Sequence, residues 1–166
     1  YSVYDTDSEA KRLMESSLEV VQKLSECFGR DIYHNGRLNR GLLSSRVFGE
    51  SDKIVLLNSI VHPVVRFDFY RWSESLNEEI CFVESAILYE SRFDELVDEV
   101  WTVTAPEELR ISRVRQRSGL TEEEIKKRMA AQLSEEEKQR RAAHIIWNDG
   151  NVSVIHTVLS LLKSLE

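Results

Sequence analysis

The sequence predicts an α/β fold of three layers, in which helices cover both faces of a parallel sheet. Three short apolar runs, at residues 80–83, 100–103 and 144–147, have the composition of strands buried on both faces. The segment 1–4 is rich in β-forming residues and is interpreted as the end of a further strand. Helical patterns separate these segments, and strands that alternate with helices are typical of this architecture. We expect a single domain spanning 1–166.

The first half of the chain is predicted to be mostly helical. Two apolar stripes with helical spacing lie within residues 8–28, and Gly29 is a suitable helix stop. The Asn35-Gly36 dipeptide is typical of a tight turn. Asn39 can then cap the helix that follows.

A proline divides the next helical pattern. His62 precedes Pro63, and proline fixes its own φ angle and disfavours helical angles in the residue before it. We therefore expect one helix to stop at this pair and another to run from Pro63 to about Leu76. Together these helices predict a helical subdomain over about residues 8–78.

The second half carries three helix-start signals. Thr104 is expected to cap a helix that begins near Pro106. Capping boxes at 121–124 and 134–137 start two short polar helices that contain few apolar residues. Because such helices cannot bury much core, we expect a protruding, mobile lid over about residues 113–142.

Composition and charge narrow the classes of function. The chain has 42% hydrophobic and 31% charged residues, as globular proteins do, and its apolar runs are too short to span a bilayer. A net charge of −7 argues against a general nucleic-acid binder. Two distant cysteines without CxxC spacing favour reduced thiols and a cytoplasmic location. Neither nucleic acid nor a membrane is an expected partner.

Two carboxylates follow the first strand. In parallel sheets, ligands bind beyond the carboxyl ends of the strands, where Asp5 and Asp7 are predicted to lie. The simpler interpretation is a helix cap, supplied by Asp7 or Ser8. A carboxylate at this edge can also take a proton from a substrate hydroxyl. The two roles can belong to different members of the pair.

Four arginines lie within residues 110–117. Arg110, Arg113 and Arg117 are spaced so that they share one face of a helix. A solvated basic face is the simpler interpretation, but arginine also suits phosphate because its charge is permanent and its donors are paired. A basic cluster in an acidic chain therefore favours a small anionic ligand, as phosphoryl transfer requires.

Several segments, taken in order along the chain, resemble motifs of the dephospho-coenzyme A kinase family, which has a P-loop kinase fold. Each match is weak alone, but together they cover nearly the whole chain and are specific. They lie at 3–7 (a strand that ends in an essential Asp), 35–43 (Asp-Gly-x-Leu-Asp-Arg-x-x-Leu), 60–63 (Ile-x-His-Pro), 84–90 (Pro-Leu-Leu-Phe-Glu), 105–117 (the arginine helix), 130–132 (the lid) and 146–150 (the adenine-side loop).

The resemblance implies transfer of the γ-phosphate of ATP, with Mg²⁺, to the ribose 3′-hydroxyl of dephospho-coenzyme A, the last step of coenzyme A biosynthesis. Asp7 would be the general base, and Arg113 would stabilise the phosphate in transfer. On the acceptor side it implies Asp5, Arg40, His62 and Glu90, and on the ATP side and lid it implies Arg117, Gln132 and Asn148. It assigns no metal ligand within this chain, and it implies a monomer or a small homo-oligomer.

The chain departs from the family pattern in two places. Ala86 stands where the family has a proline, which affects only the local geometry of the strand exit. No GxxxxGK(S/T) sequence occurs in the 166 residues, although the family begins with a strand, that phosphate-binding loop and a helix. We expect about 25 residues in front of Tyr1 to supply the first strand, the P-loop and the first helix, which are absent from these residues.

Two alternative functions stay open. Another small P-loop kinase, acting on a nucleotide or nucleoside, would share the arginine helix and the lid but would not need the His62-Pro63 segment. A non-catalytic module that binds coenzyme A or a nucleotide is the second alternative. It would be encoded from near Tyr1, whereas the kinase requires an upstream GxxxxGK(S/T).

Overall fold

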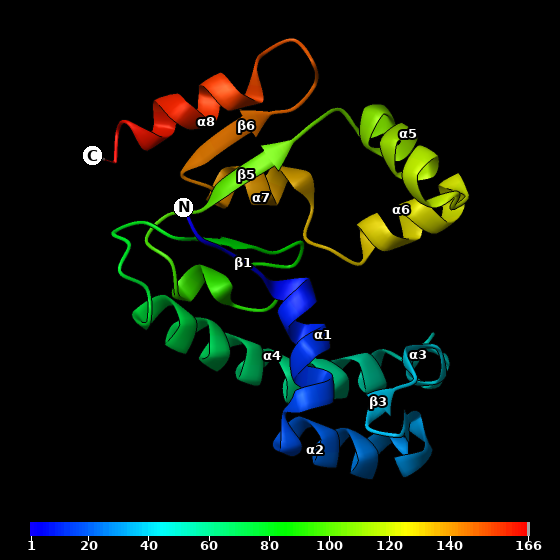
Figure 1. Cartoon of the computed structure of the whole chain (residues 1–166). Coiled ribbons are helices and arrows are strands. Elements are labelled where there is room, and N and C mark those ends of the chain that lie inside the picture. Colours follow the sequence, from blue (N-terminus) through cyan, green and yellow to red (C-terminus); the bar gives the residue numbers. More distant parts are fainter. Residues whose placement is uncertain (166) are drawn as a thin grey trace. The chain divides into compact units, whose positions relative to one another are not determined.

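The protein has a mixed α/β fold, seen here in a computed structural model that describes residues 1–165. It divides into two compact units, Tyr1–Ser91 and Arg92–Glu166 (Figure 1). Within residues 1–165, none of the helices combines the length and apolar character that a membrane crossing requires.

The first unit contains most of the helices predicted in the first half of the chain. Its elements are β1 (Val3–Asp5), α1 (Thr6–Ser16), α2 (Leu18–Phe28), the 3₁₀ helix η1 (Arg30–Ile32), β2 (Tyr33–His34), β3 (Arg37–Leu38), α3 (Arg40–Val47), α4 (Ser51–Glu74) and β4 (Phe82–Glu84). β1 and β4 form a parallel pair in which Asp5 lies opposite Glu84. The carboxyl ends of both strands therefore meet at one edge.

α1 and α2 pack against α4 to form the core of this unit (Figure 1). Val20 and Leu24 of α2 and Ile32 of η1 are completely buried. Tyr4 of β1 is 3% exposed, and its ring contacts the aromatic rings of Phe69 and Trp72 from α4. Apolar residues at helical spacing thus bury one face of α4 against the strand and the other helices.

The predicted turn and cap before α3 are confirmed. Asn35 and Gly36 both have positive φ angles, of 49° and 75°, and connect β2 to β3 as an antiparallel hairpin. Two consecutive positive φ angles are the requirement of a tight two-residue hairpin turn, which explains the Asn-Gly pair. Asn39 caps α3, because its side chain accepts a hydrogen bond from the backbone N–H of Leu42 at 3.0 Å.

The predicted helix break at His62-Pro63 is wrong. α4 continues from Ser51 to Glu74 with Pro63 inside it. Pro63 lies on the exposed side of the helix, while its neighbours Val61 and Val65 are buried. A proline removes one hydrogen bond of the helix, and burial of the apolar face on both sides of it holds the two halves in one helix.

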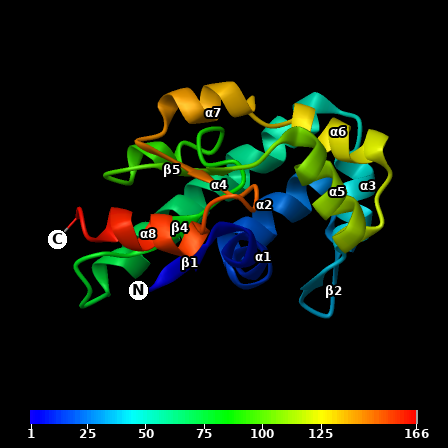
Figure 2. The ribbon, with the colours of Figure 1, turned by 90° about the horizontal axis from the view of Figure 1, so that it is seen from above.

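The second unit consists of a parallel strand pair with helices on both sides. Its elements are the 3₁₀ helix η2 (Phe93–Glu95), β5 (Trp101–Thr104), α5 (Glu107–Ser118), α6 (Glu122–Ala130), α7 (Glu135–Arg141), β6 (His144–Trp147) and α8 (Val154–Leu162). β5 pairs with β6 in parallel, with Thr104 opposite Trp147. Figures 1 and 2 show α7 on one side of this pair and α8 on the other. Phe93 and Ile146 are among the buried residues of this core.

The strands β1, β4, β5 and β6 agree with the predicted runs to within two residues, but the sheet is less continuous than expected. In the described part of the chain the hydrogen-bonded strands form two parallel pairs and one antiparallel hairpin, each with two strands. A single parallel sheet joining all the strands is therefore absent from the hydrogen bonding of residues 1–165.

The helix caps of the second unit differ from expectation at Thr104. α5 begins at Glu107 after Pro106, which makes no side-chain cap, and the Thr104 hydroxyl bonds to Glu135 instead. Thr121 and Glu124 form the complete capping box predicted for α6. The predicted box at 134–137 is half formed, because Ser134 caps α7 whereas the Glu137 carboxylate pairs with Arg140.

Candidate active site

Asp5 is the residue that caps α1. Its Oδ1 accepts hydrogen bonds from the backbone N–H groups of Asp7 (3.0 Å) and Ser8 (3.1 Å), and its Oδ2 accepts one from Ser8 Oγ (2.6 Å). These hydrogen bonds hold the pKa of Asp5 below its ordinary value, and the bond from the Ser8 hydroxyl contributes most. The prediction that Asp7 or Ser8 supplies the cap is therefore wrong, because the carboxylate that caps comes from Asp5.

Asp7 presents the second carboxylate of the pair, and this one is not used in the cap. It lies in the first turn of α1 and is exposed. Its carboxylate accepts no hydrogen bond from any described residue. Thr6, between the two acids, is buried and its hydroxyl donates to the backbone oxygen of Glu84 at 2.9 Å. This bond ties the start of α1 to the end of β4, and Asp7 is exposed in the first turn of the helix so anchored.

The other predicted residues of the first unit lie on three different elements. Arg40, the first residue of α3, pairs with Glu15 of α1 at 3.3 Å, and both side chains are partly exposed. His62 lies within α4 and is half-buried. The pKa of His62 is lowered mainly by burial of the imidazole and to a smaller extent by the positive charge of Arg66. Glu90 is exposed in the turns after β4.

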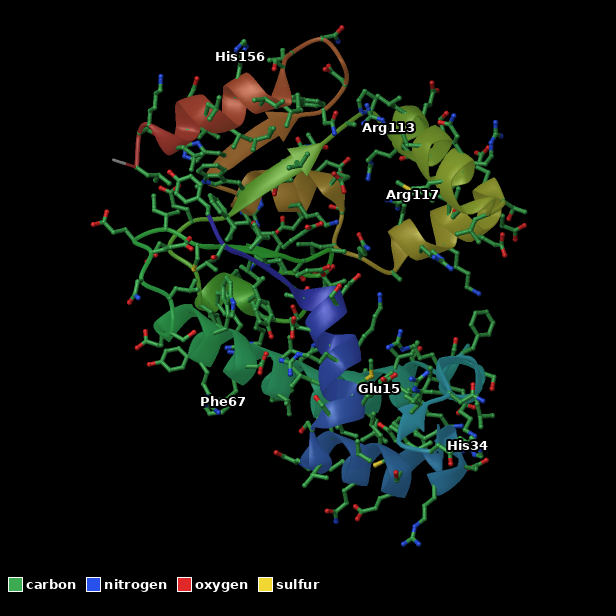
Figure 3. All side chains as sticks on the ribbon, viewed as in Figure 1. Glu15, His34, Phe67, Arg113, Arg117 and His156 are labelled. Atoms are coloured by element: carbon green, nitrogen blue, oxygen red, sulfur yellow. The ribbon has the colours of Figure 1, made fainter. Side chains whose placement is uncertain are left out.

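Arg113 and Asn148, both predicted from the second unit, are in direct contact. The Nη1 of Arg113 donates to the backbone oxygen of Asn148 at 2.7 Å. Asn148 follows β6, and its N–H bonds to Thr104 O at 2.8 Å, so the contact lies at the carboxyl end of the strand pair. Arg113 and Arg117 lie along the same side of α5 (Figure 3). Arg117 is exposed and pairs with no described residue.

Gln132 lies between α6 and α7, where the chain returns toward β5. Its Oε1 accepts a hydrogen bond from Lys138 Nζ at 3.1 Å, and its own N–H bonds to the backbone oxygen of Met129 at the same distance. α6 is not wholly polar in its contacts, since Ile125 is only 2% exposed. The segment predicted to be a lid therefore has a small apolar contact of its own.

Comparison with known proteins now decides the family. A family model described as dephospho-CoA kinase matches residues 1–153, which is most of the chain. This chain belongs to the dephospho-CoA kinase family. Dephospho-CoA kinases of Porphyromonas gingivalis and Bacteroides fragilis are 35% and 36% identical to it over 165 and 164 residues. The alignments cover 99% and 98% of this chain, and 82% and 80% of those proteins.

Solved structures show the same fold. The crystal structure of a Thermus thermophilus protein superposes with a TM-score of 0.83 at 32% identity, covering 100% of this chain and 85% of that one. The dephospho-CoA kinase of Campylobacter jejuni superposes with a TM-score of 0.70 at 23% identity, covering 100% and 87%. The second likeness shows the shared fold.

Beside the predicted residues of this dephospho-CoA kinase family member, the structure shows contacts that the sequence patterns did not identify. Ser8 completes the cap that occupies Asp5, and the run Asp5-Thr6-Asp7-Ser8 is typical of a helix start without indicating which acid caps it. Glu135 binds Arg110 at 3.0 Å and Thr104 at 3.0 Å. No spacing in the sequence joins these three residues, which come from α7, α5 and β5.

Magnesium, which the kinase family implies, is compatible with this donor set. Residues 1–165 contain no cluster of three or more His, Cys, Asp or Glu side chains that could hold a metal ion. Mg²⁺ does not require such a cluster, because it keeps several waters and binds one or two carboxylates together with substrate phosphates. With Asp5 engaged in the cap, Asp7 is the member of the pair whose carboxylate is available to it.

Proposed function

We propose that this protein transfers the γ-phosphate of ATP to the ribose 3′-hydroxyl of dephospho-coenzyme A and so forms coenzyme A, the last step of its biosynthesis. The observation that carries this proposal is the match of the dephospho-CoA kinase family over residues 1–153. The uncommitted carboxylate of Asp7 and the arginines of α5 supply the chemistry that the reaction needs.

Asp7 is the proposed general base. The 3′-hydroxyl gives its proton to the Asp7 carboxylate as its oxygen bonds to the γ-phosphorus. The bond between that phosphorus and the oxygen that bridges it to the β-phosphate breaks, and ADP leaves with the electron pair of this bond. The absence of described hydrogen bonds to this carboxylate supports the role, because a base needs a lone pair directed at the substrate. Asp5 contributes to the acceptor side through the helix start that it caps.

Arg113 is the proposed cation for the phosphate in transfer, and Arg117 assists it from the next turn of the helix. A phosphoryl-transfer transition state is stabilised mostly by charges that are already in position. The bond from Arg113 Nη1 to Asn148 O supports this role, since it fixes one nitrogen and leaves the other donors of the guanidinium for the phosphate. Asn148 and Gln132 belong to the ATP side in the same proposal.

Arg40, His62 and Glu90 are proposed to bind dephospho-coenzyme A. All three belong to the unit Tyr1–Ser91, and the helical acceptor subdomain of about residues 8–78 is proposed within it. The low pKa of His62 supports recognition by a neutral imidazole near pH 7. Arg40 keeps a permanent charge that can attract the phosphates of the substrate.

The remaining parts of the proposal concern the whole protein. We propose that 1–166 works as one kinase domain of the three-layer α/β/α type, with residues 113–142 as a lid that excludes water during transfer. Mg²⁺ enters with ATP and neutralises charge on its phosphates. The protein acts as a monomer or small homo-oligomer in the cytoplasm, on small molecules alone.

Coenzyme A formation by the complete gene product, from ATP and dephospho-coenzyme A, tests the proposal. We expect turnover that collapses in the Arg113→Ala variant while the variant stays folded. Phosphorylation of a different nucleotide or nucleoside, with dephospho-coenzyme A untouched, would assign the chain to a sister activity. A folded protein that binds coenzyme A but phosphorylates no acceptor would be a binding module, and the kinase proposal would be wrong.

A further inference from the structure

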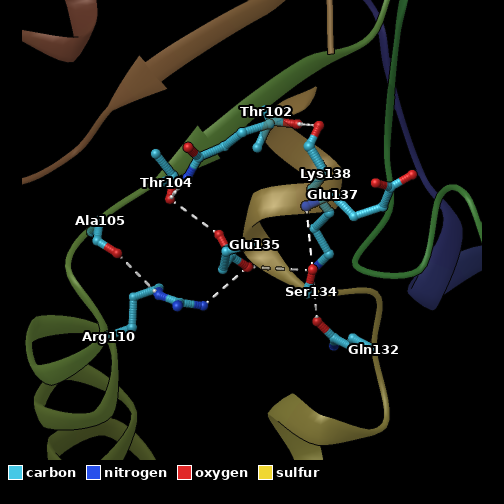
Figure 4. A network of polar contacts seen from close by, with 10 residues as sticks. Thr102, Thr104, Ala105, Arg110, Gln132, Ser134, Glu135, Glu137 and Lys138 are labelled. Carbon is cyan, nitrogen blue, oxygen red and sulfur yellow. Dashed lines mark hydrogen bonds and ion pairs between the residues drawn. The ribbon is translucent and has the colours of Figure 1, made fainter. Parts of the chain in front are cut away.

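Glu135 connects three segments of the second unit through one carboxylate (Figure 4). Its Oε2 accepts a hydrogen bond from the Thr104 hydroxyl at the end of β5, at 3.0 Å. Its Oε1 pairs with Arg110 of α5 at 3.0 Å and with Lys138 of α7 at 3.5 Å. Thr104 is 3% exposed, and the three charged side chains are 16% to 26% exposed. The cluster is therefore partly shielded from solvent, which reduces the screening of its charges.

Arg110 is held at two points, which fixes the beginning of α5. Its Nε donates to the backbone oxygen of Ala105 at 3.0 Å, while its Nη1 pairs with Glu135. Ala105 lies directly between β5 and α5, so this side chain closes the strand-to-helix connection. The connection makes no side-chain cap of its own, since Pro106 stands at the cap position of α5. The Glu135–Arg110 pair therefore replaces the missing cap as the element that holds the helix start.

We propose that Glu135 is a positioning residue for phosphoryl transfer, acting through Arg110 to set the orientation of the helix that carries Arg113 and Arg117. The inference rests on the proposed kinase function. Arg113 lies three residues after Arg110, one turn along the same helix, and is tethered to Asn148 at its other side. A rotation of the helix at Arg110 would move the guanidinium of Arg113 away from the phosphate.

Glu135 also separates the arginines by task. Its carboxylate neutralises Arg110, so this cation is directed to the scaffold rather than to the substrate. Arg117, about two turns further along α5, has no described carboxylate partner. Gln139 contributes to the same fixation, because its Nε2 donates to Thr104 Oγ1 at 3.2 Å. The positive charge intended for phosphate is then concentrated on the two arginines nearer the end of α5.

Glu135→Gln tests this role, with Glu136→Gln as its matched control. The two residues are adjacent in the first turn of α7, so both substitutions remove one negative charge from the same helix start. Glu136 is exposed and has no described partner, whereas Glu135 has three. We expect Glu135→Gln in the complete gene product to lower kcat roughly 10- to 100-fold, as small misplacements of a catalytic group do. KM for dephospho-coenzyme A should change little, and Glu136→Gln should match the unmodified protein.

The outcomes separate this inference from the proposed function. Equal kcat values for the two glutamine variants, in a protein that turns over dephospho-coenzyme A, would overturn the positioning role alone. Absence of turnover in the unmodified protein would instead refute the function on which it rests. An unchanged kcat with a raised KM would also overturn the inference, because the proposed defect lies in transfer.

Arg110→Lys provides a second variant in case Glu135→Gln does not fold. It keeps the charge beside Glu135, but the single ammonium nitrogen lacks the fixed arrangement of Nε and Nη1 with which the guanidinium holds Ala105 O and the carboxylate. We expect the same loss of kcat, while Arg115→Lys on the exposed side of α5 leaves it unchanged. A fully active Arg110→Lys variant would show that the second bond of Arg110 is not needed, and the inference would fail.

Discussion

Asp5→Ala and Asp7→Asn change two carboxylates that are two positions apart and have different surroundings. Asp5 accepts three hydrogen bonds, at 2.6, 3.0 and 3.1 Å, all from the first turn of α1. The Asp7 carboxylate accepts none from the described residues and is exposed. The first substitution therefore removes a helix cap, whereas the second preserves the shape of the side chain and removes its ability to accept a proton.

We expect Asp5→Ala to affect mainly thermal stability and Asp7→Asn to affect mainly kcat. Loss of one helix cap in a chain of this length should lower the midpoint of thermal unfolding by roughly 2 to 4 °C. Asp7→Asn should lower kcat by roughly 10² to 10⁴, the range for loss of a general base, and leave the unfolding midpoint nearly unchanged. KM for dephospho-coenzyme A should stay close to its original value, because the amide occupies the same volume. Asp5→Ala should retain most of kcat at a temperature where it is folded.

Coenzyme A formation under saturating ATP, together with thermal unfolding of the same samples, measures both effects. The decisive result is that one variant loses stability while the other loses kcat. A general loss of structure would instead lower both kcat and the unfolding midpoint in the same variant. A folded Asp7→Asn protein with the kcat of the unmodified enzyme would refute the general-base role. An Asp5→Ala variant that loses activity to the extent expected for Asp7→Asn, at unchanged stability, would show that the assignments within the pair are reversed.

Three further predictions follow from single contacts. Arg113→Ala should lower kcat for coenzyme A formation by roughly 10²- to 10³-fold, because it removes one donor that stabilises the transition state. An effect on KM alone would contradict this prediction. The pKa of His62 is below its ordinary 6.5, so the unfolded chain binds this proton more readily, and stability is lost as the pH falls from 6.5 through the lower pKa of the folded protein. Urea unfolding between pH 5 and 8 should show that loss diminished in His62→Gln, and an identical pH profile would refute it. Leu24→Ala should reduce the free energy of unfolding by about 2 to 5 kcal/mol in urea, because Leu24 is fully buried. Leu18→Ala, at an 86% exposed position in the same helix, should change it by less than about 0.5 kcal/mol, and equal effects would contradict the burial.

Features that depend on neighbouring residues in the chain were predictable from the sequence. The turn at Asn35-Gly36 and the capping box of Thr121 with Glu124 each lie within four residues, and both are confirmed. The strand 144–147 was expected at its observed position because a buried parallel strand is a continuous apolar run. In these cases the chemistry of the local sequence is sufficient to determine the backbone.

Features that depend on distant contacts were not predictable in the same way. Pro63 was expected to end a helix, but burial of Val61 and Val65 on the opposite side holds α4 together across it. Thr104 is of a residue type that often caps helices, yet its hydroxyl bonds to Glu135, 31 residues later in the chain. In both places tertiary contacts determine the structure against the local helix-stop or helix-cap preference, and a short sequence pattern does not contain these contacts.

In the candidate site too, the sequence identified the residue types but not which of them are held by contacts within the fold. Side chains of one type occur in sets, the two acids Asp5 and Asp7 and the three arginines that share one face of α5, and in each set one member is engaged in a helix cap or an ion pair within the fold. Asp5 caps α1 while Asp7 stays available, and Arg110 is neutralised by Glu135 while Arg117 has no described carboxylate partner. Residue type and spacing identified both sets as candidates, and the resemblance to the kinase family gave their members the expected roles in phosphoryl transfer. The division within each set depends on the hydrogen bonds of Asp5 to the first turn of α1 and on the ion pair of Arg110 with Glu135, which short sequence patterns do not reveal.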